Sequence, residues 1–119
     1  MTEDKKTVLV VEGDGAVRNV CARMIEEMGY NTIPACNGQE AVDMYRDADG
    51  VLMGCDMPEK NGLEALAEIR AEDKDIPIIM MSGDMTDEKI EYFKEHNATD
   101  YLEKPFETSD LRAKLKQYI

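Results

Sequence analysis

Five short apolar runs, each followed by a segment of helical period, constrain the fold of this chain more than any other feature. The runs span residues 7–11, 30–35, 50–54, 76–81 and 99–103. After the first run, Val17, Cys21 and Met24 recur at spacings of four and three, which is typical of an amphipathic helix. Apolar strands that alternate with helices indicate a parallel sheet covered on both faces. We therefore predict an α/β fold with a doubly wound sheet of five strands, in the order 2-1-3-4-5, and five helices.

Helix-capping signals agree with this division. The side chains in position to cap a predicted helix are those of Asp14, Asn37, Asn61, Thr86 and either Thr108 or Ser109. Glu40 and Glu64 stand three residues after two of these caps, which is the spacing of a capping box. With 119 residues, the chain has the length of one domain, so we predict a single domain over residues 1–119.

Charge and cysteine content exclude several classes of partner. The net charge of −12 repels phosphate backbones and anionic lipids, so we expect this domain to bind neither nucleic acid nor a membrane directly. The N-terminal residues lack the long apolar segment of a signal peptide. Three cysteines without a C-x-x-C spacing are typical of reduced thiols, so we predict a cytoplasmic location.

Polar residues gather where the predicted strands end. They are Glu12 and Asp14 after the first strand, Asp56 after the third, Ser82 after the fourth and Lys104 after the fifth. In a doubly wound sheet, ligands bind beyond the carboxyl ends of the strands, near the switch between strands one and three. Carboxylates, a hydroxyl and an ammonium from distant segments should therefore meet at one edge, where we predict the functional site.

Four segments resemble, in order and spacing, the signature segments of response-regulator receiver domains: "VLVVEGD", "MPEKNGLEAL", "IIMMSG" and "DYLEKPF". The resemblance covers the chain from about Val8 to its end. It implies a flavodoxin-like fold and a role in two-component or phosphorelay signal transduction, not an enzyme. The implied partners are a sensor histidine kinase or a downstream output protein. In this family the kinase's phosphoryl group passes to an aspartate, with Mg²⁺ bound alongside.

The chain departs from the family pattern at two positions. The acceptor aspartate stands four residues before the proline of a Met-Pro pair, and that position is Gly54 here. Of the two acids that follow the first strand and hold Mg²⁺, only Glu12 is present, because the second position is Gly13. An acyl phosphate needs a carboxylate nucleophile, so we predict no phosphorylation at the usual site.

The other family positions keep their side chains. Ser82 matches the hydroxyl that contacts the phosphoryl group, Tyr101 the aromatic switch and Lys104 the lysine that pairs with the phosphoryl group. The remaining candidate metal ligands are Glu12, Asp14 and Asp56, the last through its backbone carbonyl. Since Mg²⁺ needs carboxylates in near-octahedral geometry, we expect its binding to be weak or absent. The resemblance also implies a cis peptide between Lys104 and Pro105.

With fewer competing acids, Lys104 should bridge Glu12, Asp14 or Asp56. The interpretation of the chain as a receiver domain without its acceptor makes two structural predictions. The ends of strands one and three should be adjacent, and no other carboxylate should fill the space left at Gly54 beside Lys104. We also predict that the domain is locked in one conformation and is more stable without Mg²⁺ than a form that carries both aspartates.

Alternative functions remain open at this stage. Asp56 could replace the acceptor, although it should lie in the loop, several ångströms from Lys104 and Ser82. The segment "VLVVEGDGAV" also resembles the opening of haloacid-dehalogenase-type phosphatases, with Glu12 at the nucleophile position. Dinucleotide binding is disfavoured because Arg18 replaces the third glycine of G-x-G-x-x-G. The receiver fold could also serve as a phosphorylation-independent docking module.

Overall fold

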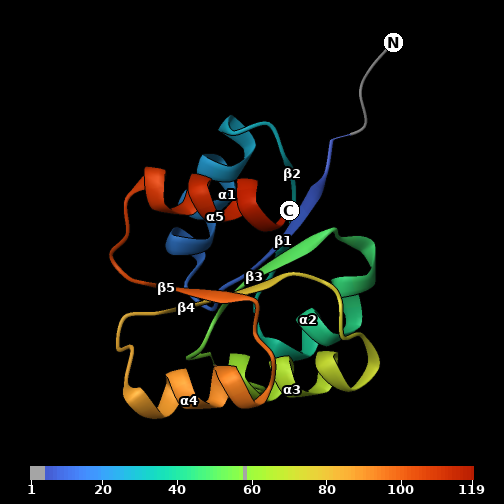
Figure 1. Cartoon of the computed structure of the whole chain (residues 1–119). Coiled ribbons are helices and arrows are strands. Elements are labelled where there is room, and N and C mark those ends of the chain that lie inside the picture. The colour runs from blue at the N-terminus through green and yellow to red at the C-terminus, as the bar shows by residue number, and fades with distance from the viewer. Residues whose placement is uncertain (1–4, 58) are drawn as a thin grey trace.

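The chain alternates strand and helix as predicted in the computed structural model, which describes residues 5–57 and 59–119 (Figure 1). The strands are β1 (Thr7–Val11), β2 (Asn31–Ala35), β3 (Gly50–Gly54), β4 (Ile78–Ser82) and β5 (Asp100–Glu103). Neighbouring strands pair in parallel in the order β2-β1-β3-β4-β5, which confirms the predicted flavodoxin-like topology. Three strands differ from the predicted runs by one or two residues. β2 begins at Asn31, β5 begins at Asp100, and β4 begins at Ile78 and includes Ser82, which was expected to follow it.

Five α-helices cover the two faces of this sheet. They are α1 (Gly15–Glu27), α2 (Gly38–Met44), α3 (Gly62–Glu72), α4 (Asp87–Glu95) and α5 (Thr108–Tyr118). Helices α1 and α5 lie on one face, and α2, α3 and α4 lie on the other (Figure 1). A 3-10 turn over Tyr45–Asp47, absent from the sequence prediction, extends α2. Among the described residues, no helix combines the length and apolar character needed to cross a membrane.

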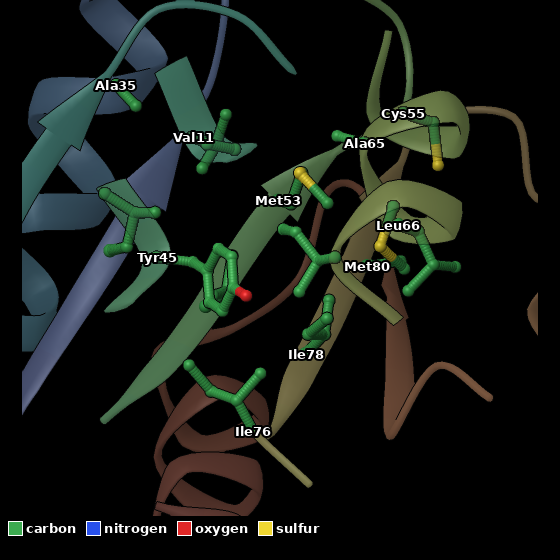
Figure 2. Packing of buried hydrophobic residues seen from close by; sticks show 14 of the residues in the cluster. Val11, Ala35, Tyr45, Met53, Cys55, Ala65, Leu66, Ile76, Ile78 and Met80 are labelled. Atoms are coloured by element: carbon green, nitrogen blue, oxygen red, sulfur yellow. The ribbon is translucent and has the colours of Figure 1, made fainter. Parts of the chain in front are cut away.

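The central strands are buried on both faces, which explains their continuous apolar sequences. Along β1, Val8 and Val10 join the core beneath α1 and α5, whereas Leu9 and Val11 join the core beneath α2, α3 and α4. This alternation follows from the two-residue period of a strand. Figure 2 shows the second of these cores, where Tyr45 packs among the side chains of β1, β3 and β4.

The helix starts largely match the sequence prediction. The side chains of Asp14, Asn37, Asn61 and Thr86 all accept hydrogen bonds from backbone N–H groups in the first turn of the helix that follows. The start of α5 was predicted wrongly. Glu107 is the N-cap residue of that helix, and its backbone N–H donates a 3.1 Å hydrogen bond to Oδ2 of Asp110, so neither Thr108 nor Ser109 is the cap. A glutamate in this role escapes a search that looks for short polar side chains.

Strand register brings the predicted site residues to one edge. Val11 pairs with Met53, so the next residues along the two strands, Glu12 and Gly54, are neighbours. The required contact between the tails of strands one and three is therefore confirmed. On the other side of β3, Gly54 pairs with Met81, which places Ser82 at the same edge of the sheet.

Candidate functional site

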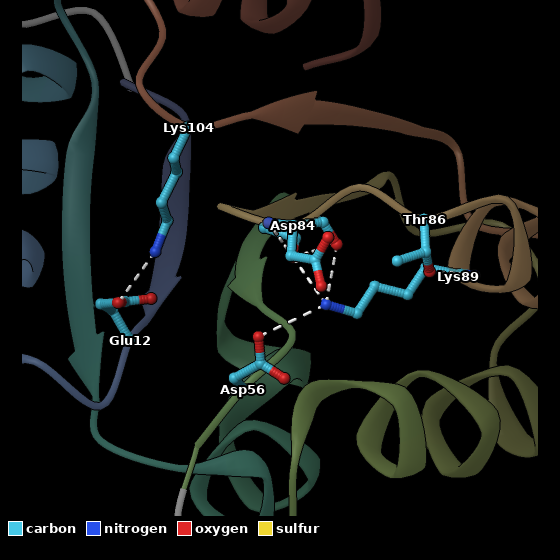
Figure 3. A network of polar contacts seen from close by, with 7 residues as sticks. Glu12, Asp56, Asp84, Thr86, Lys89 and Lys104 are labelled. Atoms are coloured by element: carbon cyan, nitrogen blue, oxygen red, sulfur yellow. Dashed lines mark hydrogen bonds and ion pairs between the residues drawn. The ribbon is translucent and has the colours of Figure 1, made fainter.

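An ion pair between Glu12 and Lys104 stands at the centre of this edge. The Lys104 ammonium donates a 3.0 Å hydrogen bond to Oε1 of Glu12, across the ends of β3 and β4 (Figure 3). Glu12 is 6% exposed, so its carboxylate has little contact with water, and the Lys104 ammonium compensates its charge. The guanidinium of Arg18 in α1 bonds the Glu12 backbone carbonyl at 2.7 Å and holds the chain there. The prediction that Lys104 bridges one of three nearby acids is confirmed for Glu12.

The space beside Gly54 is filled by this same glutamate. A Cβ atom added to Gly54 would lie 2.3 Å from Oε2 of Glu12, far inside van der Waals contact. The expectation that no other carboxylate fills that space was therefore wrong. Glutamate carries one methylene more than aspartate, and this reach lets its carboxylate extend from the end of β1 to the end of β3. Oε2 is buried and lacks a hydrogen-bond partner among the described residues.

Asp14 and Asp56 serve other partners. Asp14 caps α1, where its Oδ1 accepts from the backbone N–H groups of Ala16 and Val17 at 2.9 and 3.2 Å. Asp56 follows β3 in the loop, as predicted, and its side chain is 81% exposed. It lies 3.4 Å from the ammonium of Lys89, which reaches it from α4 (Figure 3). A role for Asp56 as a substitute acceptor stays a prediction.

Lys89 was missed by the sequence analysis. Its ammonium donates 2.9 Å hydrogen bonds to the hydroxyl of Ser82 and to the backbone carbonyl of Asp84. A signal for it existed, because Lys89 stands three residues after the cap of α4, Thr86, in the turn of the helix nearest the strand ends. That signal is weak, since a lysine in the first turn of a helix is ordinarily a solvated charge.

Tyr101, the predicted aromatic switch, lies on β5 and is 37% exposed. Its ring packs against that of Phe93 in α4, with centroids 5.6 Å apart and planes at 34°. Phe93 itself is buried in the core beneath α2, α3 and α4. The peptide bond between Lys104 and Pro105 is cis, as the resemblance implied.

The candidate metal ligands do not fit a Mg²⁺ ion as the structure arranges them. Glu12 pairs with one ammonium, Asp56 with another, and Asp14 faces a helix start. In the parts of the chain that the structure describes, no group of three His, Cys, Asp or Glu residues is placed to hold a metal. Mg²⁺ requires several oxygen ligands in near-octahedral array, and the carboxylates of Glu12 and Asp14 already accept hydrogen bonds from the Lys104 ammonium and from backbone amides.

Comparison with known proteins defines the class. Residues 8–116 match the family of the response regulator receiver domain, and the chain belongs to this family. It is 32% identical, over 98% of its length, to a probable transcriptional regulator ycf27 of Guillardia theta, of which the match covers 46%. It is 33% identical, over 94% of its length, to the response regulator MprA of Mycolicibacterium vanbaalenii, of which 49% is covered. The chain thus spans about half the length of these relatives.

Solved structures agree with this assignment. The chemotaxis protein CheY4 of Vibrio cholerae superposes with a TM-score of 0.90 at 27% identity, covering 98% of this chain and 100% of that one. The receiver domain of the sensor histidine kinase PA1611 of Pseudomonas aeruginosa, with a magnesium ion in its active-site cleft, gives 0.88 at 28% identity. In that match 97% of this chain and 98% of the other are covered.

The family assignment fixes the general role of the chain. Receiver domains are signalling modules that bind Mg²⁺ in the active site, and response regulators interact with histidine kinases and output domains. The haloacid-dehalogenase alternative finds no support in these comparisons.

Proposed function

We propose that this chain is a receiver domain of two-component or phosphorelay signalling that is not phosphorylated at the usual site. The observation that carries the proposal is the position of the Glu12 carboxylate, which fills the space beside Gly54 and pairs with Lys104. In the receiver pattern, Gly54 stands where the acceptor aspartate belongs. The chain therefore holds a partly buried ion pair at the point where the receiver pattern places a reactive carboxylate.

Glu12 is poorly placed to replace the missing nucleophile. One of its oxygens bonds the Lys104 ammonium, and the other is buried against Gly54. Phosphoryl transfer requires an in-line approach of donor and acceptor oxygen, so a buried oxygen cannot attack without leaving its site. Mg²⁺, which assists this transfer in the family, is expected to bind weakly or not at all. Its absence would remove the charge neutralisation on which the reaction depends.

The proposed role is a cytoplasmic docking module over residues 1–119, with no enzymatic activity of its own. A sensor histidine kinase or a downstream output protein is the expected partner, and it would recognise the fold without a phosphoryl trigger. The net charge of −12 disfavours direct binding to nucleic acid or to an anionic membrane. Any effect on DNA would then require another protein or another domain.

Phosphorylation can be tested by incubating the protein with a small acyl phosphate and Mg²⁺ and measuring its intact mass. The unmodified mass should persist, whereas a double variant, Gly13→Asp with Gly54→Asp, should gain one phosphoryl group. Peptide mapping would reveal a modified Asp56 or Glu12 if the wild-type protein were labelled. A phosphoryl group on either residue of the wild-type protein would overturn the proposal.

Metal binding requires a separate titration. Adding Mg²⁺ while following the backbone amide signals of Glu12, Asp14 and Asp56 should give small, non-saturating shifts in the wild-type protein. Saturable binding in the low millimolar range or tighter would contradict the expectation, because it would show that the remaining oxygens rearrange around the ion.

A further inference from the structure

We propose that Lys89 acts as an internal ligand that fastens α4 to the end of β4 and so fixes the surface around Tyr101 without any external trigger. We call its three contacts, to the Ser82 hydroxyl, the Asp84 carbonyl and the Asp56 carboxylate, the Lys89 tie. This inference rests on the proposed function, because it supplies the fixed conformation that a receiver domain without a phosphoryl signal needs.

The ammonium of Lys89 is fully used by the tie. An ammonium has three donors, and Lys89 directs them to Ser82 Oγ at 2.9 Å, Asp84 O at 2.9 Å and Asp56 Oδ2 at 3.4 Å. Its side chain is 16% exposed, so these contacts replace water around most of the charge. The contact with Asp56 is the weakest, because it is long and its carboxylate is well solvated.

The hydroxyl of Ser82 is equally saturated. It donates to the backbone carbonyl of Asp84 at 3.1 Å, and it accepts from the Asp84 N–H at 3.1 Å and from Lys89 at 2.9 Å. A hydroxyl offers one donor and two acceptor positions, so every position is occupied. Ser82 therefore has its hydrogen-bonding capacity satisfied from within the chain, and a group arriving at this edge would have to displace Lys89.

The tie reaches the outer surface through α4. The backbone N–H of Lys89 bonds the Thr86 cap at 3.2 Å, so the residue is held at its backbone as well as at its ammonium. One turn further along the same helix, Phe93 packs against the Tyr101 ring of β5. Fixing the first turn of α4 thus fixes the helix that packs against Tyr101, and the side chain of this tyrosine keeps one conformation.

Hydrogen exchange measured by NMR on the whole chain tests the tie. The key variants are Lys89→Met, which keeps the apolar stem but removes the ammonium, Ser82→Ala, and the two combined. Lys94→Met is the matched control, because it removes an exposed lysine from the same helix. Lys89→Arg is a rescue variant, because it keeps a positive charge and several N–H donors at the end of a long side chain.

Each single variant of the tie should speed exchange of the α4 amides about tenfold, the effect of losing roughly one net hydrogen bond. The increase in exchange rate in the double variant should be smaller than the product of the two single increases, because both changes remove the hydrogen bond between Lys89 and Ser82. Core amides of β1 and β3 should be unaffected, Lys89→Arg should restore slow exchange, and Lys94→Met should change it less than about threefold.

Two results would overturn the inference: α4 exchange in Lys89→Met that matches Lys94→Met, or effects of the two tie substitutions that multiply in the double variant. Failure here differs from failure of the proposed function. Phosphorylation of the wild-type protein would refute the proposed function, whereas unchanged exchange in Lys89→Met would refute only the tie.

Discussion

Replacing Gly54 by aspartate should destabilise the domain when no divalent cation is present. The new Cβ would lie 2.3 Å from Oε2 of Glu12, so the glutamate must give way. The obstacle is the end of a flexible side chain, and the backbone can therefore stay in place. The main cost is electrostatic, because two carboxylates would compete for the single ammonium of Lys104.

The size of this effect follows from the geometry. Two unit charges about 5 Å apart repel by about 3 kcal/mol at an effective dielectric constant of about 20. Replacing a glycine stabilises the folded protein by about 0.4–1 kcal/mol, because it lowers the conformational entropy of the unfolded chain. Displacing Glu12 also releases an oxygen that was buried without a partner, which recovers about 1 kcal/mol. The expected net loss is about 1–2 kcal/mol.

Urea denaturation in EDTA measures this loss directly. If the free energy of unfolding falls by about 2 kcal/mol per molar urea, the unfolding midpoint of Gly54→Asp should lie about 0.5–1 M below that of the wild type. Gly83→Asp is the matched control, because it adds the same side chain near the same edge, where a Cβ meets no described atom within 4 Å. That variant should stay within about 0.5 kcal/mol of the wild-type protein. Excess Mg²⁺ should restore stability to Gly54→Asp by neutralising the repulsion. A Gly54→Asp variant as stable as the wild type in EDTA would refute the reasoning.

Three further outcomes are expected. Lys104→Met should lower the free energy of unfolding by about 2–4 kcal/mol, because it leaves the Glu12 carboxylate buried and unpaired, and adding Glu12→Gln should recover part of this loss in urea denaturation. Burial acts to raise the pKa of Asp100, but the hydrogen bonds that its carboxylate accepts outweigh burial and hold the pKa below 3.8. The ionised Asp100 carboxylate therefore stabilises the fold above pH 3.8, and this stabilisation is lost as the pH falls through the pKa of the folded protein. Asp100→Asn should be less stable than the wild type near pH 7 and equally stable once the carboxylate is protonated. Burial raises the pKa of the Cys55 thiol to about 11, so an alkylating reagent at neutral pH should label the exposed Cys36 and spare Cys55 until the protein unfolds, which mass spectrometry can show.

The fold was predictable because it depends on patterns that the sequence states locally. Runs such as 7–11 and 50–54 are apolar at successive positions, which suits strands buried on two faces, and the helices between them force parallel pairing. The edge that carries the site follows from the same topology. The pattern therefore predicts that Ser82, Lys104 and Glu12 lie together.

The contacts within the site were less predictable, because they depend on the reach of long side chains. Periodicity places the Cα atom of Lys89 on α4, but only the folded geometry shows that its ammonium returns to Ser82. The same holds for Glu12, whose extra methylene decides that its carboxylate lies against Gly54. Residue type and spacing define the neighbourhood of a side chain, and packing then selects which partner it meets.

Glu12 and Gly54 are best understood as a complementary pair. A longer acid at the end of β1 needs room that a side chain on β3 would occupy, and a glycine on β3 leaves a space that would otherwise face the Lys104 ammonium. An aspartate at position 54 would repel Glu12, and a shorter acid at position 12 would leave an unfilled space between Gly54 and the Lys104 ammonium. With glycine at position 54, Glu12 has room to form a partly buried ion pair with Lys104. This explains how the edge keeps a stable structure after losing an acid that the receiver pattern places there.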